Sequence, residues 1–276
     1  MKKLICVSVL SLGACGGGGS SSTSSTAPPT TANKSAGGIW QTQFTVASGA
    51  TAGDAVNAQA IVTESGQYYY AAFNTTNGCA EVGFGTLTVN GSNISGTGVA
   101  AIVTETTIPG VLTNCVYPDG TTSGTSTLAG TVAERSSLTV TESDVTSSGT
   151  ALPSSTNTWT YSALYSEPSS LSKLAGNYTD GSDTVSIDSN GVIFEQITST
   201  GCVINGQVSI INALYNAYSF SFTYASCTGA NAGLNGVTAT GIGTLDDLQT
   251  PNKLIAGLQG NVNGQLVVVV ESLPKQ

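Results

Sequence analysis

One stretch of the sequence alternates strictly between aromatic and hydroxyl side chains: Tyr218-Ser219-Phe220-Ser221-Phe222-Thr223-Tyr224. Successive side chains of a β-strand point to opposite faces of its sheet, so the four rings would share one face and the hydroxyls the other. The same period of two occurs further upstream, where Trp40 and Phe44 fall on one face and Gln41 on the other. This alternation predicts antiparallel sheets with one dry face and one wet face.

Asn-Gly pairs mark several of the expected turns. The six pairs are Asn77-Gly78, Asn90-Gly91, Asn190-Gly191, Asn205-Gly206, Asn235-Gly236 and Asn263-Gly264. Both central residues of a type I′ turn have positive φ, which asparagine and glycine tolerate best, so Asn-Gly is a strong hairpin signal. Helix signals are almost absent. The sequence therefore predicts an all-β protein.

The composition excludes several classes of protein. Of 276 residues, 8% are charged and 39% are hydrophobic, and the mean hydropathy is +0.14. Helical bundles and coiled coils need many more charged residues, whereas disordered chains combine low hydrophobicity with high net charge. The 7 basic residues are scattered among 16 acidic ones. Because nucleic-acid binding needs clustered Lys and Arg, we expect no nucleic-acid partner.

The N-terminus has the features of an export signal. Met1-Lys2-Lys3 is positively charged, and the apolar stretch at residues 4–12 is too short to span a bilayer, which takes about 20 residues. The stretch ends in Leu12-Gly13-Ala14-Cys15, which resembles the bacterial lipobox. This resemblance implies a signal peptide at residues 1–14 and acylation of Cys15. An ordinary secretory signal that contains a cysteine is the alternative.

The same resemblance implies a location in the bacterial cell envelope. Several acyl chains on Cys15 would anchor the protein stably, which makes the membrane its expected partner. In the sorting rule of these lipoproteins, a residue other than Asp after the cysteine, here Gly16, directs the protein to the outer membrane. The acylated cysteine begins a linker, residues 15–36, that is rich in Gly, Ser, Thr, Ala and Pro, the composition of a flexible tether.

Two halves of the remaining chain show the same order of features. Gly38-Ile39-Trp40 opens the first half and Gly176-Asn177-Tyr178 the second. Each half continues with a hairpin and then a Gly-Cys pair, and each also contains a second cysteine and a glycine-rich strand. This order indicates a divergent tandem repeat with β domains at residues 37–167 and 168–276.

Four cysteines remain after Cys6 and Cys15 are assigned to the signal and the anchor: Cys79, Cys115, Cys202 and Cys227. Exported chains oxidise their cysteines, and four of them allow three pairings. If the two domains fold independently, only Cys79–Cys115 and Cys202–Cys227 keep each bond within one domain. A metal site or a reactive thiol is the alternative, but the sequence has neither a Cys-x-x-Cys motif nor a histidine.

The strand openings carry a second resemblance. Gly38-x-Trp40 and Gly176-x-Tyr178, each followed by a series of hairpins, resemble the lipocalin and avidin class of small β-barrels. The pattern also resembles uncharacterised tandem β lipoproteins of Gram-negative bacteria, especially in Asp188-Ser189-Asn190-Gly191 followed by Gly201-Cys202-Val203-Ile204-Asn205-Gly206. The resemblance implies two tandem, up-and-down antiparallel β-barrels. Two-sheet β-sandwiches are the alternative fold. Lipocalins place an Arg or Lys near the last strand, and neither residues 161–165 nor 266–270 hold one, so no lipocalin ligand residue is assigned.

The absence of histidine removes the Ser-His-Asp triad, the Cys-His pair and His-ligated zinc from consideration. We therefore expect no enzyme, no metal site and no cofactor. The expected function is a membrane-anchored, non-catalytic binding module, with a small ligand inside a barrel or a protein or glycan at the surface. A structural or adhesin-like envelope component is the first alternative. A carboxylate-dependent hydrolase is the second, and it would require converging carboxylates of perturbed pKa in a cleft.

Aromatic residues are the candidate ligand or partner contacts, because tyrosine and tryptophan are enriched in contact patches. The candidates are Trp40, Tyr68, Tyr69, Tyr70 and Tyr178. In a barrel strand, Tyr68 and Tyr70 would share one face and Tyr69 would lie exposed on the other. The run from Leu266 to Val270 is apolar on both faces and predicts a closing strand buried between the two domains.

Overall fold

The computed structural model describes residues 32–46, 52–104, 115–179 and 183–276. The signal peptide, Cys15 and nearly all of the predicted linker lie outside these residues. Residues Ala32–Gln276 form one compact unit. Among the described residues, none of the helices is long and apolar enough to cross a membrane.

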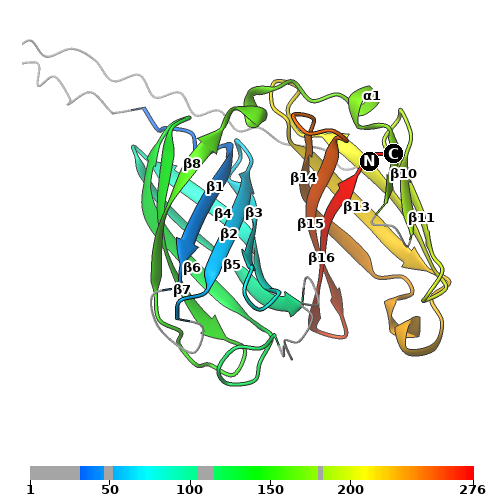
Figure 1. The fold of residues 1–276 in the computed structure, drawn as a ribbon, viewed down its shortest axis with the longest axis horizontal. Coiled ribbons are helices and arrows are strands. Elements are labelled where there is room, and N and C mark those ends of the chain that lie inside the picture. Colours follow the sequence, from blue (N-terminus) through cyan, green and yellow to red (C-terminus); the bar gives the residue numbers. More distant parts are fainter. Residues whose placement is uncertain (1–31, 47–51, 105–114, 180–182) are drawn as a thin grey trace, which may run out of the picture. The chain divides into compact units, whose positions relative to one another are not determined.

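The first eight strands form a closed antiparallel barrel (Figure 1). Their bounds are β1 Gly38–Thr45, β2 Ala55–Val62, β3 Gln67–Asn74, β4 Cys79–Asn90, β5 Asn93–Thr104, β6 Ser123–Ala133, β7 Ser137–Thr146 and β8 Ser155–Ser162. Each strand pairs with the next, and β1 closes the barrel by pairing with β8, where Trp40 lies opposite Tyr161. The predicted up-and-down barrel is therefore confirmed for this half.

The second half forms an eight-stranded antiparallel sheet in the simple order β9 to β16. Its bounds are β9 Gly176–Thr179, β10 Thr184–Ile187, β11 Val192–Ile197, β12 Cys202–Ile210, β13 Tyr218–Ala225, β14 Thr238–Asp246, β15 Lys253–Val262 and β16 Gln265–Pro274. The sheet curls into a half-barrel whose edge strands meet at one end. There Tyr178 bridges to Lys275, and the Gln276 backbone N–H donates to the Asn177 carbonyl (2.8 Å).

Short helices occur only in the connections that the structure describes. A 3₁₀ turn at Ala163–Ser166 and helix α1 at Leu171–Leu174 join the barrel to the half-barrel, and a second 3₁₀ turn follows β13 at Gly229–Leu234. The predicted domain joint at Glu167-Pro168 falls between the first two of these helices.

Two separate cores fill the two halves. In the barrel, Trp40, Tyr68 and Tyr70 are buried in the interior, and Trp40 Nε1 donates to the Ala36 carbonyl (2.9 Å). In the half-barrel, the four rings of the run from Tyr218 to Tyr224 all lie in the core, as their alternation predicts. Tyr178 lies in the same core, and its hydroxyl donates to the Leu174 carbonyl.

A third buried cluster joins the outside of the barrel to the outside of the half-barrel. Ile39, Ile61 and Tyr69 contribute from the barrel, Ile242 from the half-barrel and Tyr165 from the connection. Tyr69 is only 2% exposed, so the expectation that it lies on an exposed face is wrong. The reason is that the second sheet covers this face of β3. A Cβ atom on Gly257 of β15 would collide with the Tyr69 ring, so only glycine fits there.

The closing strand β16 contributes to two of these clusters. Leu266 and Val268 pack against the cluster between the two halves, and Val269 packs against the half-barrel core. The predicted closing strand thus contacts both halves, but these side chains are half-buried and not buried as the sequence predicted.

An arginine also connects the two halves. The Arg135 guanidinium lies 4.7 Å from the ring centre of Tyr215 and 5.0 Å from that of Tyr165, and the two rings stack at 4.9 Å. Its Nη2 atom forms a 2.7 Å ion pair with Glu64, and its Nη1 atom donates to the Gly37 carbonyl. Arg135 therefore holds the barrel end, the connection and the half-barrel together.

Both predicted disulfide bonds are present. Cys79 is bonded to Cys115, and Cys202 is bonded to Cys227. The bonds close loops with sequence separations of 36 and 25 residues, each within one half of the chain.

Candidate functional site

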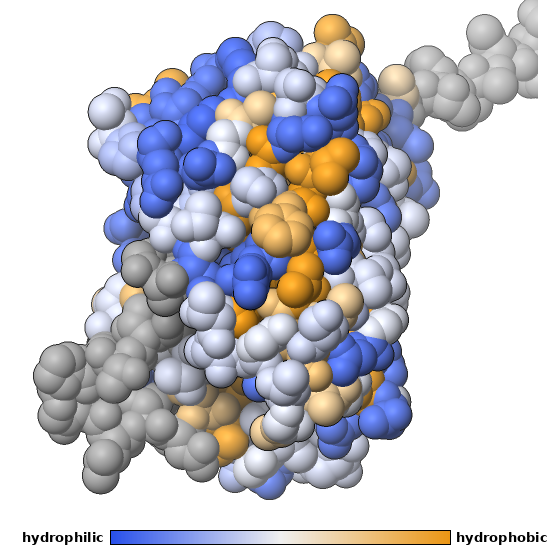
Figure 2. Space-filling view, turned by 90° about the vertical axis from the view of Figure 1, so that its right-hand side faces the viewer, coloured by the Kyte–Doolittle hydropathy of each residue, from blue (hydrophilic) through white to orange (hydrophobic). Residues whose placement is uncertain are grey.

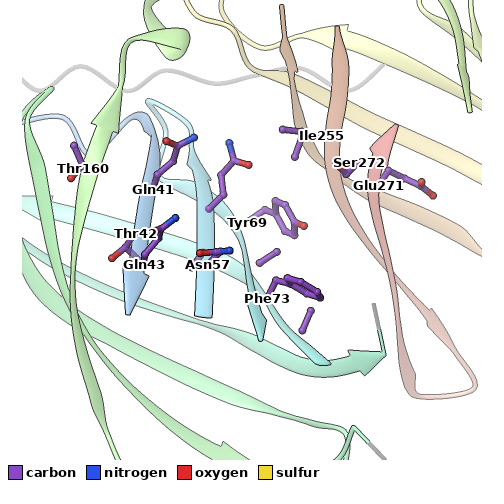
Figure 3. Close-up of a pocket in the computed structure, with 14 residues that line it drawn as sticks. Gln41, Thr42, Gln43, Asn57, Tyr69, Phe73, Thr160, Ile255, Glu271 and Ser272 are labelled. Atoms are coloured by element: carbon purple, nitrogen blue, oxygen red, sulfur yellow. The ribbon is translucent and has the colours of Figure 1, made fainter. Parts of the chain in front are cut away.

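A groove of about 840 Å³ lies on the outer wall of the barrel, where the half-barrel approaches it (Figure 3). Strands β1, β2, β3 and β8 supply most of the lining, and Ile255 and Ser272 face it from β15 and β16. The size lies within the range of pockets that hold small ligands, about 300–1,000 Å³.

Four carboxamide side chains form a compact array in this groove. Strand register places Gln41 directly opposite Gln59, and Gln43 directly opposite Asn57. Paired residues of neighbouring antiparallel strands have Cβ atoms about 4.5–5.5 Å apart, and side chains two positions apart on a strand share a face. The four amides therefore lie as two adjacent pairs on one surface, all in the lining of the groove.

These amides are available to a ligand. Gln41, Gln43 and Asn57 are exposed and Gln59 is half-buried. Within the described part of the chain, none of the four carboxamides makes a hydrogen bond. Each carries an acceptor oxygen and two donor hydrogens, so the array offers alternating donors and acceptors to a molecule that lies along it.

Aromatic and apolar side chains of the neighbouring strand also line the groove. Tyr69 and Phe73 project from alternate positions of β3, with Ala71 between them. Tyr69 is buried and forms part of the floor, whereas Phe73 is half-buried and keeps part of its ring accessible. Because Asn57 is paired with Phe73 and Gln59 with Ala71, this apolar strip lies beside the amides on the same surface of the sheet.

The groove carries almost no charge. Glu271 is its single charged lining residue, and it lies opposite Ala256, which belongs to the half-barrel core. Its side chain is therefore directed into the half-barrel, and Figure 3 shows it pointing away from the groove. A ligand in this groove would meet uncharged polar groups and one ring.

Of the five aromatic residues predicted as ligand contacts, Tyr69 lines the groove. Trp40, Tyr68 and Tyr70 lie inside the barrel, and Tyr178 lies inside the half-barrel. The structure thus does not bring the five together in one site. Cys15, the predicted acylation site, lies outside the described residues.

Sequence reasoning missed three carboxylates in the barrel interior. Glu81 of β4 and Glu142 and Asp144 of β7 place one ligand oxygen each within 4.8 Å of one another. The spacing of Glu142 and Asp144, two residues apart in a strand, was the one available signal that two of them share a face. Their meeting with Glu81 depends on the barrel topology, which the sequence does not specify.

Burial changes the chemistry of these acids. Burial, followed by the nearby negative charges of Glu142 and Asp144, raises the pKa of Glu81 to about 8. Burial and the charge of Asp144 raise the pKa of Glu142 to about 7, and burial raises the pKa of Asp144. Tyr70 donates a hydrogen bond of 2.7 Å to Glu142.

The surface has one further apolar region, on the outer face of the half-barrel. Val192 and Phe194 of β11 are 48% and 47% exposed, although both are large and apolar. Figure 2 views the side on which β10 and β11 lie in Figure 1 and shows hydrophobic side chains interrupted by hydrophilic ones. No lining residue of the groove belongs to these strands.

Comparisons with protein family models, with curated proteins and with solved structures found no match for this chain. Interpretation of the site therefore rests on its own geometry and chemistry.

Proposed function

We propose that this protein is a lipid-anchored component of the bacterial envelope that binds a neutral glycan in the groove on the outer wall of its barrel. The binding is non-catalytic: the groove holds and positions the glycan without cleaving it. The observation that carries the proposal is the two-by-two array of hydrogen-bonding carboxamides at Gln41, Gln43, Asn57 and Gln59.

The chemistry of the groove favours a sugar over other ligands. Sugar hydroxyls both donate and accept hydrogen bonds, and carboxamides match both roles. The accessible part of the Phe73 ring offers an apolar surface for the C–H face of a sugar. A charged ligand would find no ion-pair partner in the groove, because Glu271 is directed into the half-barrel.

The proposed anchor fits a protein that collects or positions a ligand near a membrane. Its support is the lipobox resemblance at Leu12-Gly13-Ala14-Cys15 and the following linker composition. Several acyl chains would hold the protein on the membrane, and the linker would allow the groove to face away from it.

A glycan array of neutral oligosaccharides tests this function. We expect the purified protein to bind a subset of these glycans, and we expect mass spectrometry to recover the bound glycan intact. The double variant Gln41→Ala/Gln59→Ala should weaken binding about tenfold, because each hydrogen bond contributes about 0.5–1.5 kcal/mol.

The matched control removes an amide elsewhere. Gln196 of β11 is exposed and does not line the groove, so Gln196→Ala should leave binding unchanged. Binding only of peptides, or equal loss of binding in both variants, would contradict the proposal. Shortened glycan products would support the hydrolase alternative.

A further inference from the structure

The interior of the barrel brings together one carboxylate from β4 and two from β7, which is distant from β4 in the sequence. Glu81 lies opposite Ala72, which packs against the barrel core, so its side chain points inward. Glu142 lies opposite the buried Leu128, and Asp144 opposite the buried Ser126. Because side chains alternate along β7, Glu142 and Asp144 both point into the barrel. One oxygen from each of the three carboxylates lies within 4.8 Å of the others.

No positive charge compensates this cluster in the described part of the chain. The ion pairs there join Arg135 to Glu64 and Lys173 to Glu167 and Asp247. The hydrogen bonds to the cluster come from tyrosines: Tyr70 lies 2.7 Å from Glu142 and 3.4 Å from Glu81, and Tyr117 lies 3.3 Å from Glu81. Two hydroxyl hydrogens cannot satisfy six carboxylate oxygens.

The disulfide bond contributes to this arrangement. Cys115 is bonded to Cys79 at the start of β4, two residues before Glu81. The bond therefore holds the segment containing Tyr117 close to the start of β4, where the Tyr117 hydroxyl reaches Glu81. The oxygen-rich end of the barrel is thus covalently fixed.

A separate observation indicates a ligand at this cluster. Tyr68 is 4% exposed, and its hydroxyl has no hydrogen-bond partner among the described residues. The ring crosses the inner wall so closely that a Cβ atom on Gly98 would collide with the hydroxyl oxygen. Gly98 is paired with Ser126, and Ser126 with Asp144. The Tyr68 hydroxyl is therefore directed along this row of residues toward the cluster.

Two more oxygens in the same row of residues are buried and lack a hydrogen-bond partner. Ser126 is 2% exposed and lies opposite Asp144, and its hydroxyl has no hydrogen-bond partner among the described residues. The Asp144 Oδ1 atom also lacks a hydrogen-bond partner within the described ranges. Buried polar atoms are rarely left unpaired, so three of them at this cluster, one of which belongs to Asp144 itself, indicate a bound group that interacts with oxygen.

We propose that the barrel interior binds one calcium ion through Glu81, Glu142 and Asp144. All of the available donors are oxygens, which hard cations prefer, and neither nitrogen nor sulfur is present to favour zinc or copper. Calcium–oxygen distances of about 2.3–2.6 Å allow ligand oxygens on opposite sides of the ion to be almost 5 Å apart. Magnesium, at about 2.0–2.1 Å, requires a tighter cluster.

Calorimetry on the full-length protein, purified in detergent and depleted of metal with a chelator, tests the proposal. At pH 8 we expect one Ca²⁺ per chain, with a dissociation constant between about 1 and 100 μM and weaker binding of Mg²⁺. The variant Glu142→Gln should weaken Ca²⁺ binding at least tenfold. Glu134, which is exposed in the turn between β6 and β7, supplies the control Glu134→Gln, which should bind as the native chain does.

A second readout locates the ion. Terbium, which replaces calcium, emits light when a nearby tyrosine is excited, so Tb³⁺ should luminesce in the native chain and be displaced by Ca²⁺. Tyr68→Phe removes one oxygen and leaves the ring, so it should weaken binding several-fold without unfolding the barrel.

The proposal would be overturned by the absence of Ca²⁺ binding in a folded native chain. It would also be overturned if Glu142→Gln and Glu134→Gln, both folded by circular dichroism, bound Ca²⁺ equally. Should Glu142→Gln fail to fold, the native chain still decides: its melting temperature must rise with Ca²⁺ and not with the same concentration of Mg²⁺.

Discussion

The substitution Glu81→Gln should change how the stability of the protein depends on pH. Glu81 has a pKa of about 8 in the folded chain, against an ordinary value of 4.5, because it is buried beside Glu142 and Asp144. The folded chain therefore keeps a proton that the unfolded chain releases. The stabilisation is complete below pH 4.5 and is lost as the pH rises through 8.

The size of the effect follows from the two pKa values. Each unit of difference corresponds to about 1.36 kcal/mol, so full titration of Glu81 lowers the free energy of unfolding by up to about 5 kcal/mol. Glu81 keeps some solvent exposure, which places the expected loss at about 3–5 kcal/mol. Glutamine cannot ionise, and it can still accept hydrogen bonds from Tyr70 and Tyr117. The variant should therefore lose less stability than the native chain between pH 5 and pH 9, and its remaining loss comes from Glu142 and Asp144, whose pKa values are also raised.

Guanidinium denaturation at unit steps from pH 5 to pH 9, with a chelator present, measures this difference. The lowered pKa values of Asp119 and Asp188 affect stability only at more acidic pH, so they do not interfere in this window. Glu134→Gln controls for the loss of one negative charge and should show the native pH dependence. Parallel curves for the native chain and Glu81→Gln, or a native stability that increases from pH 5 to pH 9, would refute the reasoning.

Three other variants test different parts of the account. Replacing Cys79 and Cys115 by serine should lower the free energy of unfolding by about 3–4 kcal/mol, as measured by chemical denaturation, because the bond closes a long loop; an unchanged midpoint would contradict this value. Gly257→Val should destabilise the protein by about 1–3 kcal/mol, because the new side chain collides with Tyr69. A scanning-calorimetry melting temperature equal to that of the native chain would show that the two halves do not pack in this way. Cys15→Ser should move the protein from the membrane pellet to the soluble fraction on cell fractionation, and persistence in the pellet would rule out the acyl anchor.

The fold was predictable where the evidence is local. The run from Tyr218 to Tyr224 carries its own period of two, and its four rings do lie in one core. The disulfide pairing followed from the tandem repeat, because each half contains two cysteines. A short segment was sufficient to predict the strand, and a count of cysteines in each half was sufficient to predict the disulfide bonds.

The groove and the acid cluster depend on long-range pairing. Gln41 meets Gln59 only because β1 and β2 pair in one particular register, and no Asn-Gly turn marks the connection between them. Glu81 meets Glu142 across the interior of a closed barrel, a contact that strand alternation alone does not predict. Tyr69 was expected to be exposed because strand alternation predicts only that its side chain points out of the barrel. Alternation does not predict that the second sheet covers this side chain.

The central claim is that a neutral glycan binds along the carboxamide array. The most direct measurement is an NMR titration of the ¹⁵N-labelled protein with the oligosaccharide that binds most tightly on the glycan array. The side-chain amide signals of Gln41, Gln43, Asn57 and Gln59 should shift together and saturate, while that of Gln196 stays in place. Shifts confined to Gln196, or to the indole of Trp40 inside the barrel, would contradict the claim.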